Sequence, residues 1–315
     1  MTGPPLVTGA TGFAGSHLVE HLLTREPAVA AWANPRGAPA GHSNAKIAWT
    51  AVDLLDRDAV GDAIATLRPS IVYHCAGAAD VGTSWADPVT PLKVNAVGTH
   101  HLLEAVRLAA PTASVVVVGS ASVYRASRDA INEESPIGPS SPYGVSKLAQ
   151  EMLAARVTTF PVFLARPFNH AGPRQSSGLV TSSFARQIAE IEAGLSAPLL
   201  SVGNLDASRD ITDVRDTVRA YRMIAKNGIA GRPYNVCSGR AYRIGDLLEM
   251  LLALASTNIR VASYPARLRP SDNPVMLGNP SRIGTDVGWH PTISIADTLK
   301  DLLEYWRRRV DVARD

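Results

Sequence analysis

Cysteine, aromatic residues and net charge are all scarce in this 315-residue sequence, and their scarcity excludes several classes of protein. The two cysteines, Cys75 and Cys237, lie far apart in apolar segments, which argues against a disulfide framework and indicates reduced thiols. Lys and Arg number 31 against 28 Asp and Glu, a surplus too small to indicate nucleic-acid binding. No apolar run reaches the length of a membrane span, and a glycine motif already at Gly9 argues against a signal peptide. We expect a cytoplasmic protein with neither nucleic acid nor membrane as a partner.

Apolar runs and helical patterns alternate along the first half of the chain. Continuous apolar strands that alternate with helices indicate a parallel sheet with both faces covered. The expected strands are Leu6–Thr8, Val29–Ala33, Ile47–Val52, Ile71–Cys75, Val115–Val118 and Val162–Ala165. The expected helices between them are Phe13–Thr24, Asp56–Leu67, Pro91–Leu108 and Pro142–Val157.

The pattern changes near Phe168, where loops rich in Gly, Pro, Ser and Arg separate shorter elements. Helices are expected there at Phe184–Ala193, Val214–Lys226, Ile244–Ala255 and Ala296–Arg308. We predict an α/β fold with a doubly wound parallel-sheet Rossmann domain over residues 1–167 and a smaller mixed α/β C-terminal substrate domain over residues 168–315. A segment of about residues 210–237 is expected to return to the first domain.

A glycine-rich turn, TGATGFAG at residues 8–15, joins the first expected strand to the first helix. Gly9, Gly12 and Gly15 suit a tight turn in which a pyrophosphate approaches the backbone closely. The helix that follows offers free N–H groups and a partial positive charge. Glycine triplets also occur in ordinary turns, but the position between strand and amphipathic helix predicts a dinucleotide site.

The residues after the second strand indicate which dinucleotide binds. An NAD site usually places Asp or Glu about 20 residues beyond the glycines, where it binds the ribose hydroxyls. Here the stretch Trp32-Ala-Asn-Pro-Arg36 has no carboxylate, and Arg36 suits a 2′-phosphate, although it could be an ordinary surface arginine. The sequence therefore favours NADP(H). Asp53 is expected near the adenine, and Ala76 and Gly77 where the backbone passes the cofactor.

Tyr143 and Lys147 lie four residues apart in an expected helix, and therefore on one face, about 6 Å apart along the axis. Free tyrosine has a pKa of about 10. A neighbouring ammonium and the positive nicotinamide are expected to lower the pKa of Tyr143, while Lys147 also holds the nicotinamide ribose. Ser120 follows the strand Val115–Val118 and is expected to hydrogen-bond the substrate oxygen. A Tyr-x-x-x-Lys pair alone is common on helix faces, but this order of motifs predicts a catalytic site.

His17 and His21 form a competing motif on the first helix, because two histidines at this spacing can bind zinc. The N-terminus of that helix is already assigned to phosphate, and Leu18 and Leu22 are expected to face the sheet. We therefore expect core packing for this helix and no metal site.

Together these motifs resemble the extended short-chain dehydrogenase/reductase family from Leu6 to Trp306. The resemblance is greatest to its branch that acts on GDP-mannose derivatives, and within it to reductases of GDP-4-keto-6-deoxy-mannose. Four segments carry this resemblance: ARPFNHAGP (165–173), SFARQIAEIEAG (183–194), VGNLDASRDITDVRD (202–216) and RPSDNP (269–274).

The resemblance implies roles for particular residues of this chain. Ser120, Tyr143 and Lys147 would be the catalytic triad, and homodimers are common in the family. The cofactor residues that it implies, beyond those already named, are Thr11, Phe13, Leu54, Asn95 and Phe168. The residues that it implies for a GDP-sugar substrate are Ser84, Ser120, Asn169, Arg209 and Arg269.

The residues that follow Ser120 help to choose between the reactions that the family catalyses. The related 4,6-dehydratases carry an acidic residue just after the catalytic Ser or Thr, which removes and returns protons. Ala121 and Ser122 stand here, so we expect NADPH-dependent reduction of the 4-keto group of GDP-4-keto-6-deoxy-mannose to a GDP-6-deoxyhexose such as GDP-rhamnose. A nucleotide-sugar 4-epimerase, which uses the same triad, is the alternative. A non-catalytic NADP-sensing protein fits less well, because such proteins tend to lose the Tyr–Lys pair.

We predict that the protein prefers NADPH to NADH by roughly ten- to a hundredfold, because a charge-assisted hydrogen bond to the 2′-phosphate contributes about 1.5–3 kcal/mol. Arg36→Ala is expected to reduce this preference mainly by weakening NADPH. Titration of both cofactors against both proteins tests this, and equal affinities in the unmodified protein would contradict it.

Overall fold

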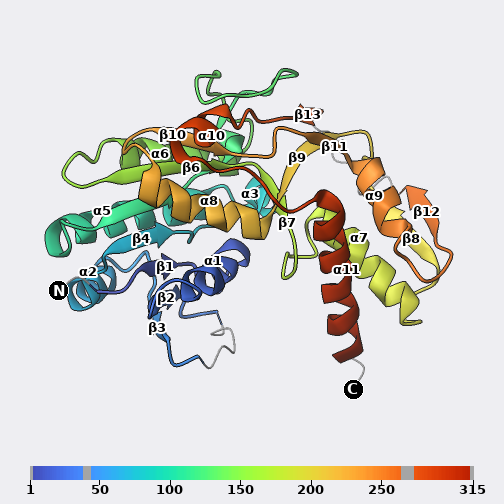
Figure 1. The fold of residues 1–315 in the computed structure, drawn as a ribbon, viewed down its shortest axis with the longest axis horizontal. Coiled ribbons are helices and arrows are strands. Elements are labelled where there is room, and N and C mark those ends of the chain that lie inside the picture. Colours follow the sequence, from blue (N-terminus) through green and yellow to red (C-terminus); the bar gives the residue numbers. More distant parts are fainter. Residues whose placement is uncertain (1–2, 38–43, 264–272, 313–315) are drawn as a thin grey trace.

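A seven-stranded parallel sheet forms the larger part of the molecule, with a smaller lobe beside it (Figure 1). The computed structural model describes residues 3–37, 44–263 and 273–312. The strand order is β3-β2-β1-β4-β5-β6-β10, so the direction of winding reverses between β1 and β4. A crevice opens at the carboxyl ends of the strands at such a reversal, and ligands of doubly wound folds bind there. The predicted α/β fold class is confirmed.

The strands of this sheet are built from short apolar runs that are buried on both faces. Val115, Val116 and Val117 of β5 are at most 1% exposed, as a parallel sheet between two helical layers requires. The strands are β1 (Leu6–Thr8), β2 (Val29–Ala33), β3 (Ile47–Ala51), β4 (Ile71–His74), β5 (Ser114–Val118), β6 (Val162–Pro167) and β10 (Pro233–Val236). The first six begin and end within two residues of the predicted positions.

Helices cover both faces of the sheet. On one face, Leu18 and Leu22 of α1 are buried as predicted, in a core shared with Val218 of α8 and Ile283 of α10. On the other face, Ile64 of α2 and Leu102 of α5 lie in a second core. The helices are α1 (Phe13–Leu23), α8 (Val214–Asn227) and α10 (Ser281–Val287) on the first face, and α2 (Arg57–Leu67), α5 (Gly98–Ala109) and α6 (Pro142–Ala155) on the second. No helix in the described ranges is both long and apolar enough to cross a membrane.

The helix predicted over Pro91–Leu108 is interrupted, and that prediction was wrong in detail. The chain forms α3 (Val81–Ala86), a single turn α4 (Val89–Pro91), a π-helical stretch η1 (Leu92–Val97) and then α5. A π turn widens the helix by one residue, and such turns are common at functional sites. Here it holds the fully buried side chain of Asn95 toward α6, where Asn95 Nδ2 donates to Ser146 Oγ at 2.8 Å.

In the part of the smaller lobe that the structure describes, three helices and two small sheets pack around an apolar core that includes Phe184, Leu247 and Leu302. The helices are α7 (Val180–Glu192), α9 (Ile244–Leu252) and α11 (Ile295–Val312). One sheet contains β7 (Asn169–Ala171), β9 (Ser208–Asp213), β11 (Ala241–Arg243) and β13 (Val275–Met276), and the other pairs β8 (Leu199–Val202) with β12 (Arg260–Ser263). The helices were predicted approximately, whereas these short strands were not predicted. The chain returns to the large sheet through α8 and β10 (Figure 1); the division at residue 167 stays a prediction.

Asp216 on α8 anchors the segment that leads into α11. Its carboxylate is 1% exposed and accepts hydrogen bonds from the backbone N–H groups of Thr292 and Ile293, at 2.7 and 2.8 Å, and from Arg219. Burial alone would raise the pKa of Asp216, but the bonds from Arg219, Ile293 and Thr292 outweigh it and lower the pKa below the ordinary 3.8.

We predict that Asp216→Asn lowers the free energy of unfolding at pH 7 by about 1.5–3 kcal/mol, because charge-assisted hydrogen bonds are lost. A carboxylate with a lowered pKa stabilises the fold above its unfolded pKa and loses this effect as the pH falls through its folded pKa. The difference between the two proteins is therefore expected to shrink below about pH 4. Urea titrations at several pH values test this. The exposed Asp62→Asn is the control, and an equal loss in both variants would contradict the prediction.

Candidate active site

The glycine turn between β1 and α1 lies against the end of β4. Gly9 has φ of +64°, and a Cβ added there would lie 2.6 Å from the Cα of Ala76. A Cβ on Gly15 would lie 2.1 Å from the carbonyl oxygen of Gly9. Gly12 caps α1 with no side-chain hydrogen bond, so the first N–H groups of the helix have no capping side chain. This backbone cradle fits a diphosphate, which needs close approach to N–H groups.

The loop after β2 lies beside this turn. The backbone N–H of Arg36 donates to Asn34 Oδ1 at 2.9 Å, and the Arg36 side chain is exposed. A Cβ on Gly37 would lie 3.9 Å from Thr11 Oγ1, so the loop and the glycine turn are neighbours. Arg36 and Thr11 therefore lie at the same edge of the candidate cofactor site.

Asp53 and Leu54 follow β3 at the adjoining edge. The carboxylate of Asp53 accepts a hydrogen bond from the backbone N–H of Leu55 at 3.0 Å, which closes the turn before α2. Leu54 is buried, and its Cβ would lie 3.0 Å from a Cβ added at Gly98. Their contact with an adenine remains a prediction.

Gly77, Asn95 and Lys147 meet at the end of β4. Asn95 Oδ1 accepts from the backbone N–H of Ala78 at 2.8 Å, which fixes the chain just beyond Gly77. A Cβ on Gly77 would lie 2.7 Å from Asn95 Oδ1 and 3.4 Å from Lys147 Nζ. Glycine at position 77 therefore allows the end of β4 to pack closely against Asn95 and Lys147.

The hydroxyl of Ser120 lies near enough to Tyr143 to favour the charged form of its phenol. Ser120 follows β5 and caps the short 3₁₀ helix η2 (Ala121–Val123), accepting from the backbone N–H of Ser122 at 3.1 Å. Ser141 caps α6, and Pro142 occupies its first turn, so Tyr143 projects from a defined helix start. Two helix caps thus fix the positions of two hydroxyl groups that are distant in the sequence.

The electrostatics of the pair differ from the expectation. Burial raises the pKa of Tyr143 above 10, and the hydrogen bond with Ser120 offsets only part of this rise. Lys147 points its ammonium at the carbonyl of Val118 and at Gln150 Oε1, each at 2.8 Å, and burial lowers the pKa of Lys147 to about 8. The expected lowering of the Tyr143 pKa by the neighbouring ammonium was wrong for the protein alone. Tyr143 is a protonated phenol near neutral pH, the form that can donate a proton.

The carboxylates nearest to Ser120 and Tyr143 form hydrogen bonds and ion pairs with other residues. Glu151 forms a buried ion pair with Arg166, and Glu133 accepts from the backbone N–H of Asn235 at 2.8 Å. Among the residues that the structure describes, no carboxylate hydrogen-bonds to Ser120, Tyr143 or Lys147. The arrangement can donate a proton but has no acidic side chain bonded to it that would abstract one from carbon.

The residues predicted for a sugar nucleotide lie in different environments. Ser84 is fully buried and donates to the carbonyl of Val81 at 2.7 Å, whereas Asn169 is exposed at the start of β7. Arg209 on β9 donates to the carbonyls of Ser208 and Pro274, at 2.8 and 3.3 Å. Two acids of the same segment, Asp206 and Asp213, pair with Arg243 and Arg215. Arg269 lies outside the described residues.

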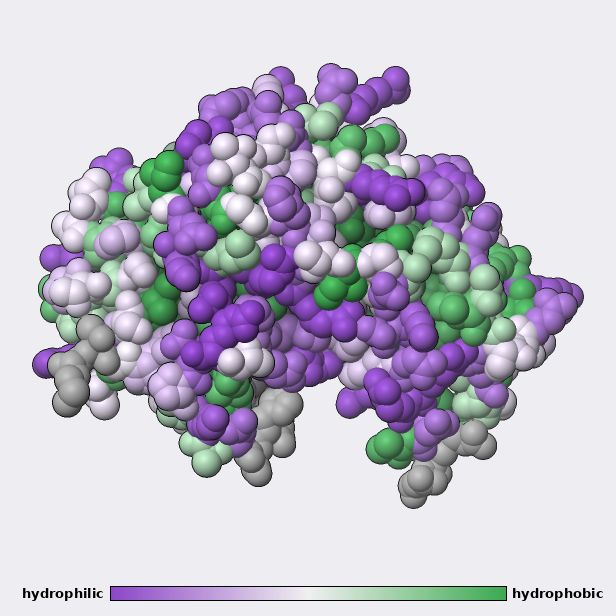
Figure 2. Space-filling model, viewed as in Figure 1, coloured by the Kyte–Doolittle hydropathy of each residue, from purple (hydrophilic) through white to green (hydrophobic). Residues whose placement is uncertain are grey.

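His170 joins the glycine turn to the smaller lobe, and sequence reasoning missed it. Its ring stacks on Phe13 with centroids 5.5 Å apart, directly after Phe168 and Asn169. His17, half of the competing zinc motif, donates from Nε2 to the carbonyl of Pro173 at 2.8 Å, and burial lowers the pKa of His17 to about 4. The HisAlaGlyPro part of the quoted segment 165–173 was the available signal. The two lobes face one another across an indentation bordered by hydrophilic residues (Figure 2).

Comparisons with known proteins agree with this geometry. The family model described as GDP-mannose 4,6 dehydratase matches residues 6–302. The chain is 37% identical to a GDP-6-deoxy-D-mannose reductase of Pseudomonas aeruginosa, over 98% of this chain and 99% of that one. A solved structure of RMD from Pseudomonas aeruginosa complexed with NADPH has 34% identity and a TM-score of 0.85, covering 98% of this chain and 100% of that one. A UDP-glucose 4-epimerase of Mycolicibacterium smegmatis is 28% identical over 96% of this chain and 98% of its own length.

We predict that Gly77→Ala weakens dinucleotide binding at least tenfold and lowers the free energy of unfolding by about 1–3 kcal/mol, because the new methyl displaces the buried Asn95. Calorimetric titration and thermal unfolding measure both effects. Gly61→Ala on α2 is the matched control, since no atom lies within 4 Å of its added Cβ. That control is expected to stabilise the helix by about 0.5–1 kcal/mol with unchanged binding. Normal binding by Gly77→Ala would contradict the assignment.

Proposed function

Because this chain belongs to the GDP-mannose 4,6 dehydratase family of extended short-chain dehydrogenases/reductases, we propose that it is an NADPH-dependent oxidoreductase that reduces the 4-keto group of GDP-4-keto-6-deoxy-mannose. The product is a GDP-6-deoxyhexose such as GDP-rhamnose. One observation supports the choice of reduction over dehydration: Ala121 and Ser122 stand where a dehydratase needs an acid, beside a buried Tyr143 whose raised pKa keeps its phenol protonated. The name of the 37% identical relative, a GDP-6-deoxy-D-mannose reductase, supports the same choice.

The residues present fit an NADP cofactor. At Gly9, Gly15 and Gly77 a Cβ would overlap neighbouring protein atoms, so these glycines allow the close packing that shapes the turn, and Arg36 with Thr11 suits the 2′-phosphate. Phe13, Ala76, Asn95 and Phe168, with Asp53 and Leu54 at the adenine end, complete the proposed lining. The bound cofactor supplies the hydride for the ketone carbon.

The protein's own groups manage the proton. The raised pKa of Tyr143 keeps its phenol protonated, so it donates its proton to the carbonyl oxygen as the ketone becomes an alcohol. Ser120 lies near that phenol and is proposed to orient the same oxygen. Lys147 uses two of its three N–H donors on Val118 and Gln150, and the third suits the nicotinamide ribose.

We assign the sugar nucleotide to the side of the smaller lobe. Arginine donates two parallel hydrogen bonds to a phosphate, so Arg209 and Arg269 suit the diphosphate, with Ser84 and Asn169 toward the sugar. The similarity to UDP-glucose 4-epimerases keeps 4-epimerisation as the second candidate. An epimerase retains its nucleotide tightly through turnover, so NAD(H) that stays bound through purification, together with tighter binding of UDP than GDP, would favour that candidate.

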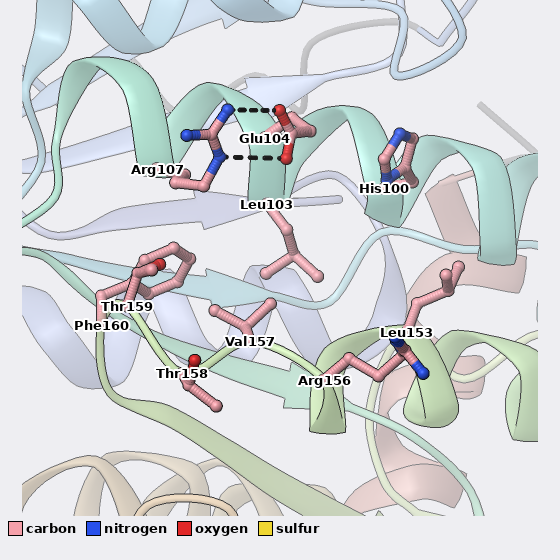
Figure 3. A pocket seen from close by; sticks show the side chains of 10 residues that line it. All are labelled: His100, Leu103, Glu104, Arg107, Leu153, Arg156, Val157, Thr158, Thr159 and Phe160. Carbon is pink, nitrogen blue, oxygen red and sulfur yellow. Dashed lines mark hydrogen bonds and ion pairs between the residues drawn. The ribbon is translucent and has the colours of Figure 1, made fainter.

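The α5–α6 face supports a homodimer. Val97 just before α5 and Leu108 near its end are exposed, and so are Val145 and Met152, which lie two turns apart on one face of α6. Figure 3 shows the neighbouring groove, where Leu103 of α5 points toward Val157 beyond α6. A second copy related by a two-fold axis would cover these apolar side chains by packing helix pair against helix pair.

The reductase proposal predicts cofactor oxidation when the protein is mixed with GDP-4-keto-6-deoxy-mannose and NADPH. Tyr143→Phe is expected to lose about a hundred- to ten-thousandfold in turnover, because general acid catalysis contributes that range, while NADPH affinity is kept. Absorbance at the NADPH band and identification of the sugar test this. Release of a 4-keto sugar from GDP-mannose by a clean preparation would overturn the reductase assignment.

The dimer proposal predicts that Met152→Glu shifts the protein toward monomer, because the buried charge would have no partner. Light scattering coupled to size exclusion measures the mass. Leu195→Glu, an exposed leucine just beyond α7, is the control and is expected to leave the mass unchanged. A monomeric unmodified protein would refute the dimer.

A further inference from the structure

A chain of buried side chains runs behind Lys147, away from the candidate substrate. Lys147 Nζ donates to Gln150 Oε1 at 2.8 Å, and Gln150 Nε2 donates to Thr99 Oγ1 at 2.9 Å. His74 bridges Thr99 and Thr8 through its two ring nitrogens, each at 2.8 Å. Gln150, Thr99, His74 and Thr8 are all 0% exposed. The chain therefore extends from the catalytic helix α6 to the strand that ends at the glycine turn.

The direction of every bond in this chain is forced. An ammonium can only donate, so the amide oxygen of Gln150 faces Lys147 and its NH₂ faces Thr99. The single Thr99 proton goes to the carbonyl of Asn95 at 2.6 Å, so His74 must donate from Nε2. Nδ1 of His74 then accepts from Thr8, whose oxygen accepts from the backbone N–H of Ala76 at 3.2 Å. Each donor and acceptor has one consistent role, which makes the chain rigid.

We propose that Gln150 is a positioning residue that orients Lys147 and sets the pH range in which Lys147 is charged. Among the described residues, it is the one side chain that accepts a hydrogen bond from Nζ, the other acceptor being the Val118 carbonyl. The His74–Thr99 link holds Gln150 in the orientation that Lys147 needs. The catalytic meaning of this role rests on the proposed function, whereas the effect on Lys147 itself does not.

The titratable side chains close to Lys147 are neutral near pH 7, so each hydrogen-bond acceptor of its ammonium matters. They are the imidazole of His74, the last residue of β4, and the thiol of Cys75, which follows it. Burial raises the pKa of Cys75 to about 12 and lowers that of His74 to about 3, so both are neutral near pH 7. Burial also lowers the pKa of Lys147 to about 8. With neutral neighbours, the ammonium depends on neutral acceptors to stay charged.

Two substitutions at Gln150 are expected to move the pKa of Lys147 in opposite directions. Gln150→Leu removes an acceptor from the ammonium, which disfavours the charged form and lowers the pKa by about one pH unit. Gln150→Glu places a carboxylate there, which favours the charged form and raises the pKa. NMR titration of ¹³Cε-labelled lysine without cofactor measures the pKa of Lys147 directly, because the protein has only five lysines. Loss of one signal in Lys147→Arg assigns the resonance.

Controls separate this proposal from a general loss of structure and from the proposed function. Gln187→Leu removes an equivalent amide, bonded to Ser201 in the smaller lobe, and is expected to leave the Lys147 titration unchanged. Thr99→Val, which frees Gln150 without touching Lys147, is expected to lower the pKa less than Gln150→Leu does, and it serves if that variant does not fold. Opposite shifts in the two Gln150 variants support the proposal. Unchanged titration in both, or an equal shift in Gln187→Leu, overturns it.

The pH dependence of NADPH affinity provides the second measurement. If Lys147 binds the ribose as an ammonium, the alkaline loss of affinity moves to lower pH in Gln150→Leu and to higher pH in Gln150→Glu. An unmodified protein that binds no NADPH would refute the proposed function but leave the lysine titration valid. If the protein binds NADPH and the pH dependence of its NADPH affinity is the same in both variants as in the unmodified protein, Lys147 does not bind the ribose as proposed.

Discussion

The hydrogen-bonded ladder between parallel strands β1, β4, β5 and β6 determines where every proposed functional group lies. Thr8 pairs with His74, His74 pairs with Val117, and Val118 pairs with Ala165, so the strands end at one edge of the sheet. The glycine turn, the Ala76–Gly77 backbone, Ser120 and Phe168 then follow at that edge. Parallel pairing, rather than any local motif, brings together segments more than a hundred residues apart. Loss of this register would separate the proton donor from the cofactor cradle.

Burial then determines the protonation states of the side chains that the strand pairing brings together. The same desolvation acts oppositely on the two groups of the catalytic helix: it favours the neutral phenol of Tyr143 and the neutral amine of Lys147. A protonated phenol serves reduction, in which the carbonyl oxygen must gain a proton. A charged lysine must instead be maintained by oriented acceptors, which explains why so many fully buried polar groups gather behind it. The hydrogen-bonded side chains from Gln150 to His74 thus help, under this proposal, to keep Lys147 charged at the catalytic edge of the sheet.

The sequence was sufficient for features that are local and repetitive. Valine-rich strands, the glycine turn and the Ser141-Pro142 helix start are short patterns whose physical meaning depends on a few neighbours, and the structure has them where predicted. The π turn around Asn95 was missed, because a helix widened by one residue keeps an ordinary helical pattern of apolar residues. The stacking of His170 on Phe13 and the link from Gln150 to Lys147 through one side of α6 were missed for a related reason. In both cases the contacting residues belong to elements that are distant in the sequence, so no local residue pattern predicts the contact. The short strands of the smaller lobe, two to six residues long, exist because neighbouring segments pair with them.

The late position of β10 has a consequence for biosynthesis. The seventh strand of the large sheet lies at residues 233–236, after much of the smaller lobe, and Trp289 still later fills the core beneath α8. A nascent chain that has released only its first 167 residues presents β6 as an open edge, with the apolar face of α1 uncovered. Open edges and uncovered apolar faces are the surfaces on which growing chains associate wrongly and which chaperones shield. The ribosome must therefore deliver nearly the whole polypeptide before the larger lobe can close, although that lobe is begun by its first residues.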